Sequence, residues 1–297
     1  MSDRKQCRAP NCGYDMPLSM QHCPHCGRPR LFPNVDQADL PDERAALDRR
    51  YRRAVSKAES RGAGPRVEAF ERFVETARPV IAFSLSNVQR LADSDNQLAE
   101  TFYMRGATNL EKGSHVLKGK AWDSIRPAAE TALFGDEAKR LIHFAALSPD
   151  EQGVSNYGDC SITLRTELIS HRTSLLEQNM LTFFKEQCAD YWKTERIRPG
   201  YRATWEDRAR LAVAKLADRV ESATGDGQFP TILLTRGATT ADDDFIELHI
   251  LGNMTARTME KVVLNRRPPN AKPSLLKALK HKLAGYNVSW LDRSTTP

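Results

Sequence analysis

The stretch FIELHILG, residues 245–252, alternates apolar and polar side chains in the manner of a β-strand. Because successive side chains on a strand point to opposite faces, the isoleucines and Leu248 share one face, and Glu247 and His249 lie on the other. A carboxylate on a strand apolar enough to be buried is costly unless it is paired or open to a cleft. We therefore expect a buried strand in which Glu247 has a specific role.

Two other short stretches share this design. Arg105 lies on the polar face of TFYMRG (101–106), and Ser161 and Thr163 lie on the polar face of CSITLR (160–165). A sheet with one solvated face alternates in the same way. Arginine, hydroxyls and a carboxylate together nevertheless favour a cleft, because this set suits a ligand with phosphates and ribose hydroxyls.

The order of elements predicts an α+β fold. Strand candidates from residue 80 onward are VIAFSL (80–85), TFYMRG, LIHFAAL (141–147), CSITLR, TILLTRG (231–237) and FIELHILG. Helix candidates are residues 121–135, at least part of 167–187, 204–223 and 272–287. Strands scattered among helices without a regular βαβ rhythm indicate a mixed or antiparallel sheet.

Four of the six cysteines lie in the first 26 residues. Cys7 and Cys12 form one short pair, Cys23 and Cys26 form another, and ten residues separate the pairs. Four thiolates at this spacing form a closed tetrahedral zinc site, whereas disulfides are the weaker alternative in a reducing compartment. The segment resembles a zinc ribbon. We expect the zinc to be structural, because four cysteines leave no open ligand position.

Two helices are expected between this segment and the α+β region. Residues 43–62 carry charges of both signs and predict a solvated helix, and residues 65–79 predict a second, amphipathic helix that ends before Pro79. The expected organisation is a zinc ribbon at 1–34, a helical linker at 35–79 and an α+β domain at 80–297.

The positive charge is concentrated at the C-terminal end. From residue 255 onward there are nine Lys or Arg against two acidic residues, a balance of +7, which leaves about −1 for the rest of a chain whose total is +6. Such a segment suits a nucleic acid or an acidic partner, although a solvated helix face would look the same.

Several classes of protein are disfavoured by what the sequence lacks. No apolar run approaches the roughly 20 residues that cross a bilayer, and the first residues do not resemble a secretory signal, so we expect a cytoplasmic protein without membrane contact. Walker, GxGxxG, HExxH and GxSxG motifs do not occur, which argues against the commonest nucleotide-binding and hydrolase families.

The order arginine, serine or threonine, glutamate along three strands resembles the ADP-ribosyltransferase fold, whose members split NAD and transfer ADP-ribose. YMRG is similar to the arginine motif of the family's first strand, SIT to its Ser-Thr-Ser strand, and FIELHILG to the strand of its catalytic glutamate. The resemblance covers about residues 80–290 and extends to uncharacterised bacterial transferase-like toxin domains.

The resemblance implies roles for individual residues. Arg105, with Gly106 beside it, would hold NAD, and Ser161 and Tyr157 would shape the nicotinamide pocket, Tyr157 by stacking. Thr163 is the alternative to Ser161.

Glu247 would stabilise the positively charged transition state. His249 is either a second polar group in the cleft or a satisfied core histidine. Phe245 stands where the family usually has an acidic or amide residue, which disfavours arginine side chains as acceptors.

Two functions follow from these observations. The first is an NAD-dependent ADP-ribosyltransferase that modifies a protein or nucleic acid as a toxin or phage-defence effector, with an antitoxin as a further candidate partner. The second is a zinc-ribbon nucleic-acid-binding protein without catalysis, whose basic C-terminal helix contacts phosphates. The first requires Arg105, Ser161 or Thr163, and Glu247 to converge on one cleft.

Overall fold

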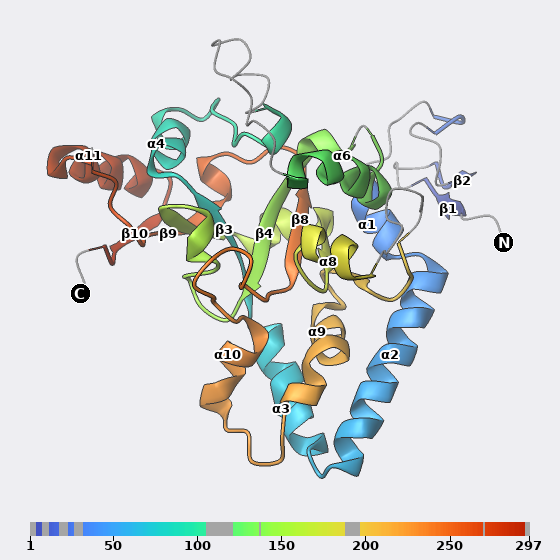
Figure 1. The fold of residues 1–297 in the computed structure, drawn as a ribbon. Helices are drawn as coiled ribbons and strands as arrows, with labels where there is room; N and C mark the ends of the chain where they lie inside the picture. The colour runs from blue at the N-terminus through green and yellow to red at the C-terminus, as the bar shows by residue number, and fades with distance from the viewer. Residues whose placement is uncertain are drawn as a thin grey trace.

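A computed structural model describes residues 4–7, 12–17, 23–26, 32–104, 121–136, 138–187, 197–269 and 271–294 (Figure 1). Its main sheet has eight strands in the order β10-β9-β5-β3-β4-β8-β6-β7. Only the edge pair β10–β9 of this sheet is parallel. The predicted α+β class with a mixed sheet is therefore confirmed.

The strands are short. In the main sheet they are β3 (Arg78–Phe83), β4 (Ile142–Ser148), β5 (Cys160–Leu164), β6 (Thr173–Leu176), β7 (Arg202–Thr204), β8 (Glu247–Leu251), β9 (Met259–Leu264) and β10 (Ser289–Asp292). A separate antiparallel pair is formed by β1 (Arg4–Gln6) and β2 (Asp15–Pro17).

Helices surround the main sheet. They are α1 (Pro33–Ala38), α2 (Pro41–Ser60), α3 (Gly64–Glu75), α4 (Leu85–Asp93), α6 (Ala121–Phe134), α7 (Thr166–Ile169), α8 (Met180–Gln187), α9 (Arg208–Leu216), α10 (Phe229–Leu233) and α11 (Pro273–Ala284). Figure 1 shows α2, α3 and α9 grouped below the sheet, with α11 far from α2.

The two faces of the sheet bury different side chains. On one face Ile162, Leu248 and Ile250 belong to the largest apolar cluster, together with residues of α3, α4, α9 and α11. On the other face Leu176 and Leu251 pack against residues of α6 and α8 in a second cluster. This second face carries Glu247 and His249, because they alternate with the first set along β8.

The helices before residue 80 pack into the main fold. Leu47 of α2 and Phe70 and Val74 of α3 are buried in the same cluster as the central strands. Each of these helices also contacts α9. The division into a linker at 35–79 and a domain at 80–297 stays a prediction.

Two expected strands are wrong where the structure describes them. In TILLTRG the chain forms α10, which starts with Pro230 in its first turn and buries Phe229 and Leu233. In TFYMRG, Phe102–Met104 is helical. The Thr101 hydroxyl accepts a hydrogen bond from the Met104 amide at 3.3 Å, a contact typical of a helix start.

The stretch 167–187, expected to be helical at least in part, contains a strand. Helix α7 ends at Ile169, β6 follows, and α8 begins only at Met180. Strand β6 lies between β7 and β8, and all four of its residues are buried. A strand buried on both faces has no alternation, so periodicity cannot separate it from a buried helix.

Candidate functional site

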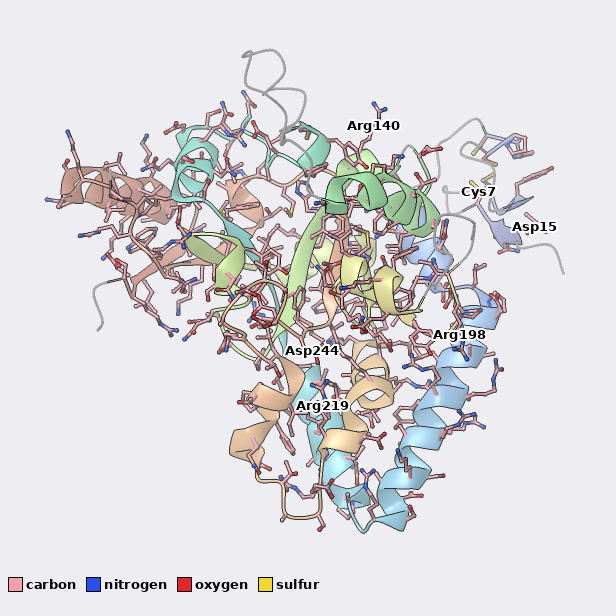
Figure 2. The ribbon with its side chains drawn as sticks, in the orientation of Figure 1. Cys7, Asp15, Arg140, Arg198, Arg219 and Asp244 are labelled. Carbon is pink, nitrogen blue, oxygen red and sulfur yellow. The ribbon has the colours of Figure 1, made fainter. Side chains whose placement is uncertain are left out.

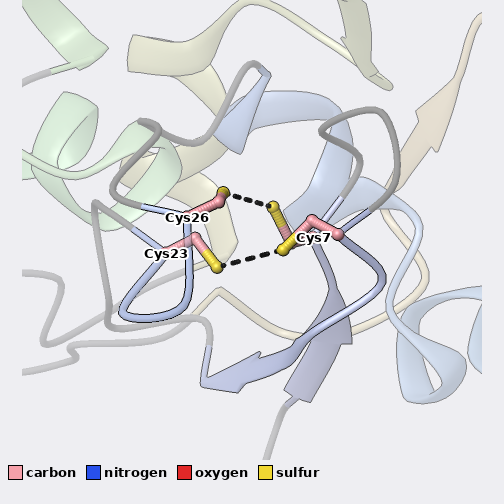
Figure 3. Close-up of side chains that lie close together, drawn as sticks. Cys7, Cys23 and Cys26 are labelled. Atoms are coloured by element: carbon pink, nitrogen blue, oxygen red, sulfur yellow. Dashed lines mark hydrogen bonds between the residues drawn. The ribbon is translucent and has the colours of Figure 1, made fainter.

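The four N-terminal cysteines come together in the structure (Figure 3). Their sulfur atoms all lie within 4.8 Å of one another. The Sγ atoms of Cys7 and Cys26 are 3.8 Å apart, and those of Cys12 and Cys23 are 3.6 Å apart. These residues could therefore hold a metal ion, as their spacing predicts.

The geometry of this cluster fits a thiolate-bound tetrahedral ion. With metal–sulfur bonds of about 2.3 Å, the sulfurs of a tetrahedral zinc site are roughly 3.8 Å apart. Gly13, directly after Cys12, has a φ of 59°, a left-handed conformation that turns the chain at this knuckle. Burial raises the pKa of Cys23, but backbone N–H groups of Cys26 and His25 and the neighbouring thiols outweigh it and lower this pKa to about 7.

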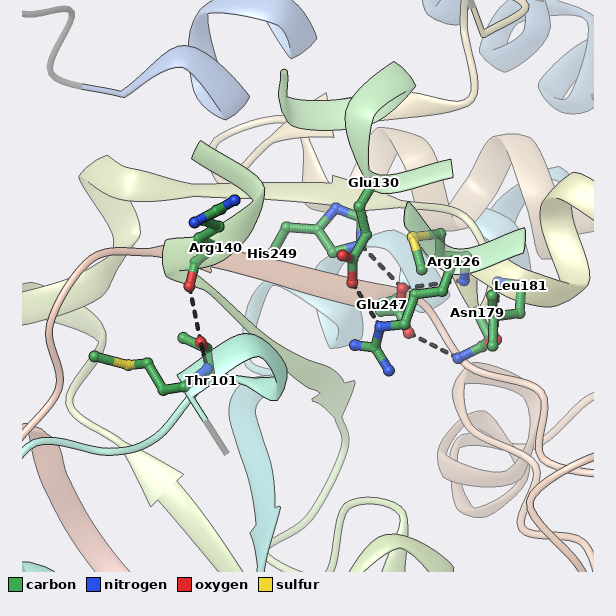
Figure 4. A network of polar contacts seen from close by, with 10 residues as sticks. Thr101, Arg126, Glu130, Arg140, Asn179, Leu181, Glu247 and His249 are labelled. Carbon is green, nitrogen blue, oxygen red and sulfur yellow. Dashed lines mark hydrogen bonds and ion pairs between the residues drawn. The ribbon is translucent and has the colours of Figure 1, made fainter. Parts of the chain in front are cut away.

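Glu247 is enclosed in a hydrogen-bonded network (Figure 4). Its side chain accepts hydrogen bonds from the Met180 amide at 3.0 Å and from the Asn179 amide group at 2.8 Å. His249 Nε2 lies 2.9 Å from the same carboxylate. The residue is only 3% exposed. The carboxylate thus holds the N-terminus of α8 onto the sheet, where the helix dipole favours a negative charge.

His249 is a buried and satisfied histidine. It is 1% exposed, and the rings of Phe134 and Phe144 approach it edge-on at centroid distances of 4.7 and 5.3 Å. Arg126 and Glu130 form an ion pair at 2.7 Å nearby on α6, which Figure 4 shows beside this network. The cluster is a buried polar layer between α6, α8 and the sheet.

Ser161 and Thr163 lie on the same face of the sheet as Glu247. They do not line a common cleft with it. A row of directly paired residues crosses four strands, and it runs Glu247, Ala146, Val80, Thr163. Three strand spacings separate its ends, which is roughly 14 Å.

The loop after β4 covers the end of this row at which Thr163 and the neighbouring Ser161 lie. The Ser161 hydroxyl donates a hydrogen bond to the Gln152 carbonyl and accepts one from Asn265 at 2.6 Å. A Cβ at Gly153 would meet the Val80 side chain at 2.6 Å, so this loop lies tightly on the sheet. Ser161 is therefore covered by protein.

Tyr157 packs beside Phe245, which lies two residues before Glu247 in the chain. Its ring packs edge-on to Phe245 at 6.1 Å, and its hydroxyl donates to the Thr240 carbonyl at 3.2 Å. Burial raises the pKa of Tyr157, and the charges of Glu247 and Asp243 raise it further. The structure thus brings Tyr157 and Glu247 into one neighbourhood. Arg105 and Gly106 lie outside the described residues, so their predicted roles remain predictions.

A pocket that the sequence patterns did not reveal lies between α2 and the segment before β7. It has a volume of about 330 Å³. Its lining residues are Ala46, Arg49, Arg50, Arg53, Arg198, Pro199 and Tyr201. We call this the arginine pocket. Figure 2 shows Arg198 beside α2, in a view that places Cys7 on the same side of the molecule.

Arg50 is held rigidly at this pocket. Its guanidinium donates hydrogen bonds to the Gly200 carbonyl and to the Glu177 carboxylate, both at 2.6 Å. It also lies over the Tyr201 ring, 3.8 Å from the centroid. Burial raises the pKa of Glu177, and the charge of Arg50 opposes this increase. Glu177 is thereby committed to an ion pair with Arg50.

The other three arginines of the pocket are exposed and carry unneutralised charge. Arg49, Arg53 and Arg198 make no ion pair with any residue in the described parts of the chain. By contrast, Arg52 on the same helix pairs with Asp48 at 2.8 Å. No carboxylate is among the residues that line the pocket.

In the basic C-terminal segment, from residue 255 onward, more than half of the cations form ion pairs, unlike the three exposed arginines of the pocket. Five of the segment's nine cations pair with carboxylates, four of them with carboxylates from earlier parts of the chain. The pairs are Arg257–Asp95, Lys261–Glu151, Arg266–Asp159, Arg267–Asp292 and Lys282–Asp93, at 2.6 to 3.5 Å. These five pairs neutralise part of the charge excess read from the sequence, and no ion pair in the described residues involves Lys272, Lys277, Lys280 or Arg293.

No protein-family model matches this sequence, and no curated protein is significantly similar to it. Within the described residues, every helix is too short or too polar to span a bilayer.

Proposed function

We propose that this chain binds nucleic acid, with the arginine pocket as its phosphate-binding surface and a structural zinc ion in the four-cysteine module. The observation that carries the proposal is the concentration of Arg49, Arg53 and Arg198, none with an ion pair in the described chain, around one pocket. Guanidinium groups recognise phosphate oxygens through paired N–H donors, and such contacts supply most non-specific nucleic-acid affinity.

The position of the cysteine module supports the same proposal. The chain from Cys26, the last cysteine of the module, to Phe32, directly before α1, is six residues long. A chain of this length spans at most about 22 Å. The amide group of Asn34 anchors α1 by donating to the carbonyls of His249 at 2.9 Å and Arg172 at 3.1 Å. The module is thereby kept within reach of the first turns of α2, which carry the pocket. We assign it zinc because four thiolates are the usual structural zinc ligands.

The test is direct binding of labelled oligonucleotides, measured by fluorescence anisotropy. Wild-type protein is expected to bind and to lose affinity as salt rises. The variant Arg53→Gln/Arg198→Gln is expected to bind more weakly. Arg52→Gln removes one positive charge from the same helix outside the pocket, and it is expected to bind like wild type.

A second candidate function, transfer of ADP-ribose from NAD, is favoured by one observation. The family resemblance assigns Tyr157 and Glu247 to the nicotinamide site, and the Tyr157 ring packs against Phe245, two residues before Glu247. Against it stands the burial of Glu247 and its use as an anchor for α8. A toxin or phage-defence role with an antitoxin partner belongs to this second candidate.

Nicotinamide release from NAD tests the second candidate. Activity in wild type that disappears in Glu247→Gln, at equal folded fraction by circular dichroism, would support it. Wild-type protein that releases no nicotinamide, with or without added protein and nucleic acid, would exclude it.

A further inference from the structure

We infer that the arginine pocket binds the terminal phosphate group of a nucleotide, at the end of a strand or free, in preference to the internal diesters of a strand. This inference rests on the proposed function, since it names the part of the nucleic acid that the pocket recognises. Charge, spacing, rigidity and volume each contribute to it.

The charge of the pocket exceeds what one diester requires. An internal phosphodiester carries a single negative charge, whereas a phosphate monoester carries about −1.5 to −2 at neutral pH. Arg49, Arg53 and Arg198 supply three charges without an ion-pair partner in the described chain, and Arg50 adds a fourth guanidinium whose charge Glu177 offsets. A compact dianion matches three converging cations better than a monoanion does.

The spacing of these arginines suits a single phosphate group. Arg49 and Arg53 are four residues apart on α2, so their Cβ atoms lie roughly 5–6 Å apart on the same helix face. Arg198 faces them from the segment before β7. Three guanidinium forks that approach from two sides can surround the three free oxygens of a terminal phosphate, whereas a diester offers only two.

One wall of the pocket, at Arg50 and the adjoining Gly200 backbone, is prearranged. Two hydrogen bonds and the Tyr201 ring fix Arg50. The Gly200 backbone lies so close to α2 that a Cβ there would meet the Ala46 carbonyl carbon at 2.8 Å. An anion that enters does not have to order these groups, which reduces the entropic cost of binding.

The small volume of the pocket favours the terminal nucleotide of a strand as its ligand. About 330 Å³ is near the lower limit of the roughly 300–1,000 Å³ that small-molecule pockets occupy. Surfaces that follow a strand backbone extend over at least about four nucleotides. A compact pocket on one side of α2 therefore fits one terminal nucleotide better than a continuous strand.

The experiment compares oligonucleotides of one sequence that carry a 5′-phosphate, a 3′-phosphate or hydroxyls at both ends, at fixed salt. One terminal phosphate is expected to increase affinity at least about tenfold, the effect of one strong charge-assisted contact. Arg53→Gln/Arg198→Gln is expected to abolish this difference, and Arg52→Gln to retain it. Both pocket arginines are exposed, so thermal unfolding should be unchanged in the double variant.

The outcomes separate this inference from the proposed function. Equal affinity for phosphorylated and hydroxyl-ended strands would overturn the inference while leaving nucleic-acid binding intact. Direct binding of a nucleoside monophosphate, measured by calorimetry, to a protein that binds no oligonucleotide would support the terminal-phosphate pocket and overturn the proposed function. A phosphate preference that survives in the double variant would place the site elsewhere and overturn the inference.

Discussion

Replacement of Glu247 by alanine is expected to lower the free energy of unfolding by about 3–5 kcal/mol. The substitution removes the acceptor of the Met180 amide, of the Asn179 amide group and of His249 Nε2. Each buried donor left without a partner costs about 1–3 kcal/mol. The Asn179 group is partly exposed and can bind water instead, and His249 can change tautomer. The fully buried Met180 amide and the cavity left by the side chain therefore account for most of the loss.

Urea unfolding followed by circular dichroism measures this loss. Glu68→Ala is the matched control, because Glu68 pairs with Arg72 on the exposed face of α3, and its loss should stay within about 0.5 kcal/mol. A double-mutant cycle with Asn179→Ala should show coupling of about 0.5–3 kcal/mol. A loss below about 1 kcal/mol for Glu247→Ala would refute the reasoning, because it would mean that the carboxylate is open to water and does not hold α8.

Three further predictions concern the metal module, the pocket wall and acid stability. Chelation or Cys23→Ser is expected to remove about one zinc ion per chain, measured by atomic emission, and zinc retained in Cys23→Ser would contradict the four-cysteine site. Gly200→Ala is expected to cost about 2–4 kcal/mol, because Gly200 has a φ of 91° and no space for a Cβ; Gly227→Ala, which meets no atom within 4 Å, should cost far less. Burial raises the pKa of Asp244, but Lys215 and Arg219 outweigh it and hold this pKa below its usual 3.8. The stability that Asp244 contributes is therefore present above pH 3.8 and is lost as pH falls through its folded pKa. The variant Asp244→Asn should be less stable at pH 7 and should lose less on acidification, and an equal acid loss in both proteins would contradict this assignment.

The elements that the sequence predicts correctly are those with strong local patterns. FIELHILG and CSITLR form strands because their alternation matches a sheet with two different faces, and residues 272–287 contain a helix because Leu276, Leu279 and Leu283 recur on one side. Residues 173–176 could not be recognised as a strand, because their sequence, Thr-Ser-Leu-Leu, does not alternate polar and apolar side chains.

Long-range contacts explain what the sequence could not predict about the site. The arginine pocket depends on α2 meeting Arg198, which lies about 145 residues from Arg53 in the chain. The ion pair of Lys282 with Asp93 likewise joins distant segments, so net charge along the sequence does not show which cations are paired in the fold. The partners of the Glu247 carboxylate, Asn179 and Met180, lie in a stretch whose turn was not predicted.

The salt dependence of oligonucleotide binding tests the central claim most directly. Neutralisation of about three phosphate charges by the three pocket arginines predicts a slope of about −2 for the logarithm of the association constant of a single strand against the logarithm of salt concentration. Arg53→Gln/Arg198→Gln should make this slope shallower by about 1.4, and Arg52→Gln should leave it unchanged. Slopes that are equal in wild type and both variants, or the absence of any binding, would contradict the assignment of the arginine pocket as a nucleic-acid site.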